Sequence, residues 1–146
     1  MTENEISSQV LDAAISVHKE IGGPGVLESY YEMALAHELS LRGLNVETQK
    51  PIPVIYKGVP IGDPYRFDMV VEDKVIVECK ATDKNNPIFA AQVLTYLRLT
   101  KLKLGLVINF GQARLVDGFS RVVNGLPDAS LGGSASQRLC VKKSGE

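Results

Sequence analysis

One segment near the middle of the chain constrains the fold more than any other, because its polar and apolar residues alternate over two extended stretches. This alternation predicts strands over Tyr65–Val71 and Val75–Lys80, joined by a turn of three residues, 72–74. A two-residue turn would mix polar and apolar residues on both faces of the hairpin, so the pattern favours the longer turn. One face is then predicted to be entirely apolar or aromatic, and it carries Tyr65, Phe67, Met69, Val71, Val75, Val77 and Cys79.

The other face of the predicted hairpin brings two carboxylates together. Its register sets Asp68 opposite Glu78, with Cβ atoms about 4.5–5.5 Å apart, and like charges in this position destabilise a sheet. Lys80 lies on the same face and compensates in part, whereas a divalent metal ion would compensate more completely. A structural alternative is that Arg66, predicted opposite Lys80, helps to neutralise the carboxylates at a solvated end of the sheet. The hairpin alone leaves both interpretations open.

Two amphipathic helices are predicted before the hairpin. Apolar residues recur in steps of three and four over residues 6–21 and again over residues 26–42, and Gly43 follows the second helix where a terminating glycine is expected. Residues 52–56 form a short extended stretch. Because prolines at positions 51 and 53 cannot donate to a sheet ladder, this stretch is predicted to be an edge strand.

The elements predicted after the hairpin complete an α/β domain. They are a mostly apolar helix over Pro87–Thr100, a buried central strand over residues 104–110 and one further strand over residues 115–123. The expected fold is a mixed central sheet flanked by helices, in one domain spanning residues 1–124. Glycine, serine and small polar residues dominate from residue 125 to residue 146, which predicts a loosely ordered tail.

Composition excludes several classes of protein. The 146 residues include 16 Lys and Arg against 17 Asp and Glu, and a net charge of -1 excludes a protein that coats nucleic acid through bulk charge, although not a local basic groove. The two cysteines lie far apart and support neither a disulfide scaffold nor a zinc site. The acidic N-terminus and the short apolar runs argue against a signal peptide and a membrane span, so a soluble cytoplasmic protein is expected.

Four motifs in a fixed order carry a resemblance to a known family. Gly25, Glu28 and Tyr31 have the spacing G-x-x-E-x-x-Y, and Gln92 and Tyr96 have the spacing Q-x-x-x-Y. Between them stand the aspartate of Tyr65-Arg-Phe-Asp68 and the tripeptide Glu78-Cys-Lys80. Over roughly residues 10–124 this set resembles the GxxExxY protein family, a branch of the PD-(D/E)XK nuclease-like superfamily.

The resemblance implies a restriction-endonuclease-like αβββαβ core with a divalent metal ion, usually Mg²⁺ with Mn²⁺ as a substitute, on the hairpin. By position, Asp68, Glu78 and the backbone carbonyl of Cys79 would bind the metal, and Glu28 would complete the acidic cluster. Lys80 would orient or activate the attacking water and stabilise charge on the phosphate. Gln92 would line the site as a further catalytic residue, and Arg66 and Tyr96 would line its substrate side. Phe89 departs from the family pattern, which often has histidine at this position.

The expected function is therefore Mg²⁺-dependent hydrolysis of phosphodiester bonds in DNA. Hard oxygen ligands suit Mg²⁺, and a fixed lysine places positive charge where the transition state gains negative charge. Two other functions stay open: a non-catalytic module with this fold that binds nucleic acid or a protein, and a structural protein with a merely solvated acidic hairpin. A homodimer formed through an edge strand or the first helix is also compatible with the sequence.

Overall fold

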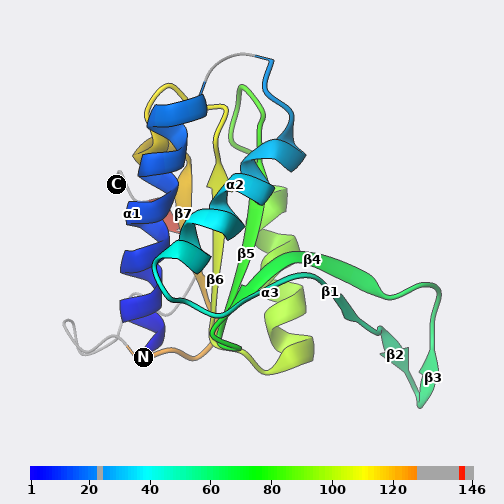
Figure 1. The fold of residues 1–146 in the computed structure, drawn as a ribbon. Helices are drawn as coiled ribbons and strands as arrows, with labels where there is room; N and C mark the ends of the chain where they lie inside the picture. The colour runs from blue at the N-terminus through cyan, green and yellow to red at the C-terminus, as the bar shows by residue number, and fades with distance from the viewer. Residues whose placement is uncertain (23–24, 128–141, 144–146) are drawn as a thin grey trace.

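The computed structural model describes residues 1–22, 25–127 and 142–143, and it has the predicted α/β architecture (Figure 1). The helices are α1 (Glu3–Ile21), α2 (Glu28–Leu41) and α3 (Pro87–Thr100), with a 3₁₀ helix, η1 (Leu115–Gly118). The strands are β1 (Val46–Ile52), β2 (Ile55–Tyr56), β3 (Val59–Pro60), β4 (Tyr65–Val71), β5 (Val75–Lys80), β6 (Leu104–Asn109), β7 (Phe119–Val123) and β8 (Lys142–Lys143).

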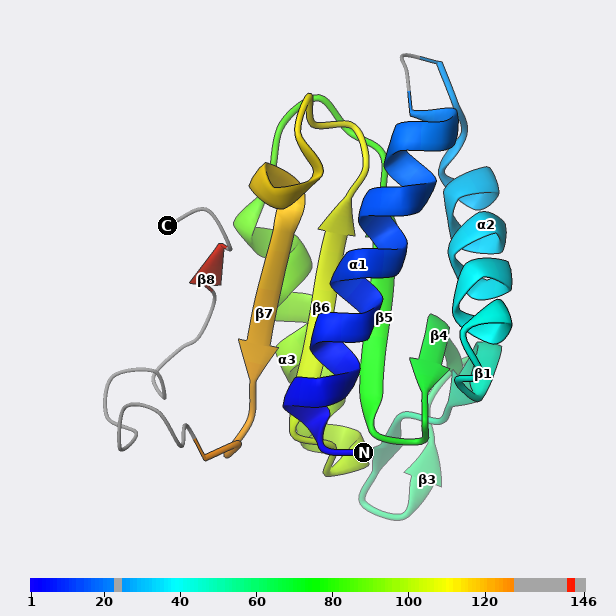
Figure 2. The same ribbon diagram turned by 60° about the vertical axis from the view of Figure 1, so that its left-hand side comes forward.

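The main sheet has six strands in the order β1-β4-β5-β6-β7-β8, and β2 and β3 form a separate pair. β5 and β6 are parallel, whereas the other neighbours in the main sheet are antiparallel. Helices α1 and α2 cover one face of the sheet and α3 covers the other (Figure 2). The series α2-β1-β4-β5-α3-β6 is the expected αβββαβ core, and the β2–β3 hairpin is inserted between its first two strands.

Local signals explain where the helices begin and end. α1 begins three residues earlier than its apolar periodicity predicts, because Thr2 and Glu5 form a capping box at its N-terminus. α3 has the predicted bounds, with the Asn86 side chain accepting a hydrogen bond from the Ile88 N–H. Gly43 follows α2 with a φ of 84°, the left-handed conformation that glycine adopts readily.

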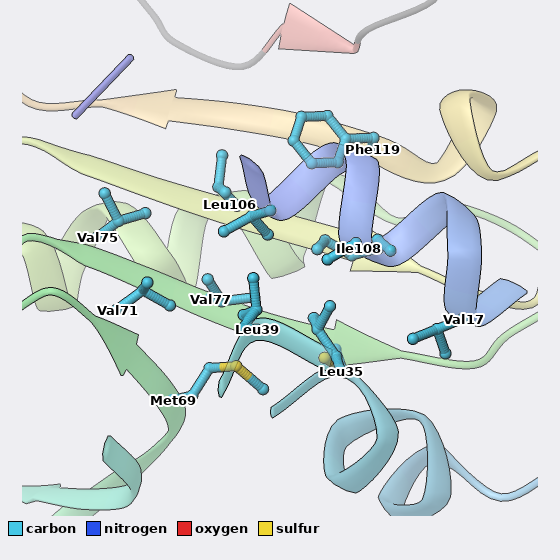
Figure 3. Close-up of a cluster of buried hydrophobic side chains, with 14 of the residues drawn as sticks. Val17, Leu35, Leu39, Met69, Val71, Val75, Val77, Leu106, Ile108 and Phe119 are labelled. Carbon is cyan, nitrogen blue, oxygen red and sulfur yellow. The ribbon is translucent and has the colours of Figure 1, made fainter. Parts of the chain in front are cut away.

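Two apolar clusters hold the layers together. The larger lies between the sheet and helices α1 and α2, and Figure 3 shows side chains of both helices meeting the inward residues of β4, β5 and β6. The smaller joins the opposite face to α3. Helix α3 packs closely on β6, since a Cβ added at Gly105 would collide with the side chain of Val93. A side chain at this position of β6 would therefore displace Val93 from its place on the sheet.

The segment between α2 and β4 differs from the prediction. The edge strand of the main sheet is β1 at Val46–Ile52, and the predicted strand over residues 52–56 is wrong in its bounds. Ile55–Tyr56 instead pairs with Val59–Pro60 outside the main sheet. Within β1, Gln49 has a φ of 54°, so the backbone kinks in the middle of the strand and continues toward the hairpin.

The hairpin register is confirmed, whereas its single apolar face is not. Val71 pairs with Val75 and Met69 with Val77, as the three-residue turn requires. Met69 belongs to the cluster under α1 and α2, but Phe67 belongs to the cluster under α3. The alternation breaks at Asp68 because β4 there leaves β5 and bends away with β1 (Figure 1), and Tyr65 follows Phe67 to the α3 side.

At the C-terminal end, residues 115–123 form the turn η1 and then strand β7, so the predicted strand there is shorter than expected. Most of the predicted tail, residues 128–141 and 144–146, lies outside the described residues. Lys142–Lys143 pairs with Ser120 and Arg121 of β7. Among the helices that the structure describes, none has the length and apolar character needed to cross a membrane.

Candidate active site

The candidate site lies where β4 and β5 separate, and two carboxylates bridge the strands there. Main-chain pairing between these strands covers three residue pairs and ends at Met69 and Val77. Beyond it, the Glu78 Oε1 accepts a hydrogen bond of 3.0 Å from the Asp68 N–H, and the Asp68 Oδ2 accepts one of 2.7 Å from the Cys79 N–H. Side-chain oxygens therefore take the places of main-chain carbonyls, and Asp68 and Glu78 stay across from each other as predicted.

The backbone of Cys79 also faces this gap. The Lys80 carbonyl accepts from the Phe110 N–H at the β6 side of the strand, whereas the Cys79 N–H points to the β4 side. The N–H and C=O of one residue in a strand point to the same side, so the Cys79 carbonyl lies on the β4 side of the strand. The prediction that the Cys79 carbonyl binds the metal ion requires this orientation.

An aromatic group from β4 and α3 orients Glu78. The Tyr65 hydroxyl donates a 3.0 Å hydrogen bond to Glu78 Oε2, and the Tyr65 ring stacks on Tyr96 with centroids 3.9 Å apart. Phe67 meets the Tyr96 ring edge-on at 5.4 Å. Because Glu78 is 4% exposed and both of its oxygens accept a hydrogen bond, its carboxylate has a fixed position. Tyr96, predicted to line the substrate, is half-buried and packs behind Glu78.

Two glutamates of α2 add to the negative charge at the site. Glu28 is the first residue of α2, and its pKa is raised by desolvation and, to a smaller extent, by Asp68, whereas Lys80 lowers it. Glu32, one turn further along, has a pKa raised by desolvation and then by Asp68 and Glu28. Its side chain accepts a 2.7 Å hydrogen bond from Gln49 at the kink of β1. Four carboxylates therefore influence one another across the gap between α2 and the hairpin.

Burial is the main reason why the pKa values of Asp68 and Glu78 are raised. Burial and then the charge of Asp68 raise the pKa of Glu78 from 4.5 to about 7, against smaller opposite effects of its hydrogen bonds and of Lys80. Burial also raises the pKa of Asp68, while the Cys79 N–H and Lys80 lower it. In the absence of a further cation, protonated and ionised Glu78 are therefore both populated near neutral pH.

This raised pKa predicts a stability that depends on pH in metal-free buffer. The folded state holds the Glu78 proton more tightly than the unfolded state does, so this contribution is complete below pH 4.5 and is lost as the pH rises to about 7. Urea unfolding in EDTA should show a loss on the order of 3 kcal/mol over this range. The variant Glu78→Gln should lack this part of the slope, and an equal slope in both proteins would contradict the assignment.

Lys80 is held at the end of β5 by an aromatic ring of α3. Its ammonium lies 4.8 Å from the centroid of the Phe89 ring, within the range of a cation–π contact. The charge of Lys80 lowers the pKa of Glu28, Asp68 and Glu78, so this lysine acts electrostatically on all three carboxylates. The residue that departs from the family pattern therefore contacts the predicted catalytic lysine directly.

The remaining predicted residues lie at the margins of this group. Gln92 is exposed on α3, one turn before Tyr96. Arg66 is exposed and donates a 3.3 Å hydrogen bond to the Gln49 carbonyl of β1. It pairs with Pro51 of β1, so the prediction that it lies opposite Lys80 in the β4–β5 pair is wrong. The cause is again the separation of the two strands beyond the pair formed by Met69 and Val77.

A buried asparagine fixes the loop that leads from Lys80 to α3. Asn109, 1% exposed at the end of β6, accepts hydrogen bonds from the N–H groups of Thr82 and Gly111 through Oδ1. Its Nδ2 donates to the Thr82 hydroxyl and to the Asn85 side chain, with all four distances at 3.0 Å. Because the buried Asn109 amide has all of these partners, it fixes the loop between β5 and α3. This loop determines where Phe89, in the first turn of α3, lies relative to Lys80.

Three contributors to the site were missed from the sequence: Glu32, Tyr65 and Asn109. Glu32 follows Glu28 by four residues, a spacing that places both on one face of a helix and could have indicated it. Asn109 ends an otherwise apolar strand, a second available signal. Nothing in the alternation pattern distinguishes Tyr65, because its position depends on the bend of β4.

A cavity of about 480 Å³ lies elsewhere, at the ends of α1, β5 and β6. Its lining includes His18, Tyr31 and Phe110, and none of the predicted catalytic or substrate-lining residues is among the residues that line it. The His18 Nε2 and the Gln112 carbonyl are 3.0 Å apart beside this cavity. The cavity is therefore separate from the carboxylates of the hairpin.

The oxygen atoms at the site fit a hard divalent cation that takes only some of its ligands from the protein and the others from water. Within residues 1–22, 25–127 and 142–143, no group of three or more His, Cys, Asp and Glu side chains is arranged to hold a metal ion. Asp68, Glu78 and the Cys79 carbonyl nevertheless offer oxygen to one gap, and a net negative group of carboxylates faces Lys80. Mg²⁺ is usually bound by one or two carboxylates and retains several waters, so this set is compatible with it.

A mixed sheet flanked by helices, with carboxylates at the divergence of two antiparallel strands and a lysine two residues beyond, defines a restriction-endonuclease-like fold. The family model of the PD-(D/E)XK nuclease superfamily matches residues 4–122. The chain belongs to this superfamily, which indicates a nuclease-type function, a nucleic-acid substrate and the general use of divalent metals. No curated protein and no solved structure gives a significant match to the chain.

Proposed function

We propose that this protein is a Mg²⁺-dependent nuclease that hydrolyses phosphodiester bonds in DNA, and that it is a cytoplasmic member of the GxxExxY branch of its superfamily. The observation that carries the proposal is the reciprocal pair of hydrogen bonds across the gap between β4 and β5. These bonds hold Asp68 and Glu78 on opposite sides of one space, with Lys80 beside them. An acidic pair kept in this arrangement costs stability and is understandable as a metal site.

In this proposal Asp68, Glu78 and the Cys79 carbonyl hold the metal ion, and Glu28 completes the acidic group from α2. A divalent ion held there would supply positive charge for the phosphate and would lower the pKa of the attacking water. The Tyr65 hydroxyl fixes one oxygen of Glu78, and the Asp68 oxygen that does not accept from the Cys79 N–H would be the ligand that Asp68 provides. Mn²⁺ is the expected substitute, because it accepts the same oxygen ligands.

The other residues act on the substrate. The Lys80 ammonium orients the attacking water or stabilises the charge that develops on the phosphate, in a position set by the Phe89 ring. Gln92 and Arg66 extend from α3 and β4 at the margins of the site, where an amide and a guanidinium can donate hydrogen bonds to the DNA backbone. Tyr96 contributes by supporting Tyr65 from behind.

The direct test is cleavage of single-stranded, duplex and branched DNA by the full chain in Mg²⁺, in Mn²⁺ and in EDTA. The proposal expects new 5′-phosphate or 3′-hydroxyl ends in Mg²⁺ or Mn²⁺ and none in EDTA. Cleavage that is equally fast in EDTA would contradict the metal-dependent mechanism. Cleavage of RNA with no cleavage of DNA would contradict the substrate.

One observation favours a second function, a non-catalytic module that binds nucleic acid or a protein partner. Glu78 already accepts hydrogen bonds at both oxygens, and no third acidic or histidine side chain joins the hairpin pair as a metal group in the described part of the chain. This function predicts DNA binding that is insensitive to EDTA, together with no cleavage of any of the three DNA forms.

A further inference from the structure

The hairpin formed by β2 and β3 projects from the body of the protein at the end of β1 and β4 (Figure 1). Its main-chain pairing is extended by a 2.8 Å hydrogen bond from the Ile61 N–H to the Val54 carbonyl. Its large side chains are exposed: Ile55 by 49%, Tyr56 by 61%, Val59 by 56% and Ile61 by 50%. Exposed apolar residues gathered on a short projecting hairpin contribute little to the core and indicate an interaction surface.

The turn of this hairpin has a residue that its backbone disfavours. Lys57 and Gly58 have φ values of 48° and 82°, the positive pair typical of a two-residue type I′ turn. Asparagine, aspartate or glycine suits the first position, whereas lysine is strained there. The Lys57 ammonium lies 5.5 Å from the centroid of the Tyr56 ring. The tip therefore presents a cation beside an exposed aromatic ring, at some cost in backbone conformation.

The hairpin is continuous with the candidate active site. The chain returns from β3 through residues 61–64 into β4, which carries Arg66 and then Asp68. On the outgoing side, β1 leads into the hairpin from Gln49, whose carbonyl accepts from Arg66. DNA bound through a metal ion at Asp68 and Glu78 would therefore extend past Arg66 of β4 toward the hairpin, where Tyr56 is exposed and Lys57 lies in the turn.

We propose that the β2–β3 hairpin contacts DNA at a junction between duplex and single strand, an inference that rests on the proposed nuclease function. Lys57 contacts a backbone phosphate, and Tyr56 and Ile55 pack against an unstacked base, as apolar and aromatic side chains do on exposed nucleobases. A second copy of this chain fits less well. The hairpin segment, residues 53–64, has 12 residues. Each partner of a stable protein interface usually contributes roughly 20–30 residues.

The test measures DNA binding separately from cleavage. Fluorescence anisotropy with a junction oligonucleotide, in Mg²⁺ and on a Lys80→Ala background, gives the dissociation constant and its dependence on salt. Tyr56→Ser should weaken binding to the junction by about tenfold, the loss of one stacked base. Lys57→Asn should weaken it by a smaller factor and reduce the slope of log K against log salt by about 0.9.

Controls make the two variants interpretable. Lys57→Asn places a residue that tolerates the left-handed conformation in the turn, so its thermal midpoint should be equal or higher while DNA binding falls. Tyr30→Ser removes a tyrosine of α2 that is 55% exposed, and Tyr30 lies about 200° around the helix from Glu28. This control should leave binding unchanged.

Two results would overturn the inference. One is unchanged junction binding in both Tyr56→Ser and Lys57→Asn. The other is a dimer of the parent protein, seen by sedimentation, that Tyr56→Ser dissociates without changing DNA binding, because the hairpin would then be a contact between copies. Neither result depends on whether the parent protein cleaves DNA, so failure of the inference is distinguishable from failure of the proposed nuclease function.

Discussion

Replacing Lys80 by alanine should lower metal-dependent DNA cleavage by about 10²- to 10³-fold at saturating Mg²⁺, the usual effect of removing one group that stabilises transition-state charge. The side chain ends beside the Phe89 ring and makes no hydrogen bond to the core within the described part of the chain, so the fold should be retained. Initial rates on the DNA form that the parent protein cleaves best, measured with the thermal midpoint of each protein, would check this prediction.

Saturating Mg²⁺ is needed because Lys80 also lowers the pKa of Asp68 and Glu78, and its loss weakens metal binding at a fixed pH. The matched control is Lys84→Ala, which removes the same charge from an exposed residue of the loop after β5. A similar loss of activity in both variants would indicate a general effect of charge on DNA binding. If Lys80→Ala cleaved DNA as fast as the parent protein, this result would contradict the catalytic role of Lys80.

Replacing Asp68 by asparagine should abolish Mn²⁺ binding measured by titration calorimetry, and at the same time stabilise the metal-free protein. The asparagine carbonyl can still accept from the Cys79 N–H, while the repulsion that raises the pKa of Glu78 disappears. We expect a gain of about 1 kcal/mol in unfolding free energy at pH 8, since one pKa unit corresponds to this scale. Loss of Mn²⁺ binding together with a gain in unfolding free energy would indicate that the two carboxylates repel each other in the metal-free protein and that a bound cation relieves this repulsion.

The control for this prediction is Asp83→Asn, an exposed aspartate in the loop after Lys80. It should leave both Mn²⁺ binding and the free energy of unfolding unchanged. Mn²⁺ binding that persists in Asp68→Asn would remove Asp68 from the proposed ligands. A loss of stability in this variant would show that the acidic pair is structural, neutralised by its hydrogen bonds alone.

Much of the fold was predictable because its signals are local. The capping asparagine and proline define α3, and the segregation of polar and apolar residues requires the three-residue turn between Val71 and Val75. The membership in a nuclease superfamily was predictable from the order of four short motifs. These features depend on residues close together in the chain or on a fixed spacing.

The rest depends on a bend that no local pattern encodes. Alternation assumes that two strands stay paired, and it therefore assigned Phe67 to the face of Met69 and Arg66 to a position opposite Lys80. β4 stays paired with β1 from Tyr65 to Val71 but with β5 only from Met69 to Val71, and Tyr65 packs on Tyr96 of α3. Both are tertiary contacts between distant segments. The predicted catalytic and metal-binding residues stay a prediction.

The hydrogen bonds from Asp68 and Glu78 to main-chain amides also determine what a survey of many variants in living cells would detect. An apolar residue at either position leaves a buried N–H without a partner, so the amount of folded protein should fall together with its activity. At Lys80, activity alone should fall. One screen would measure the abundance of each variant and a second screen would measure its activity in the cell. Comparing them would distinguish Asp68 and Glu78 from Lys80 and identify active-site positions without purified enzyme.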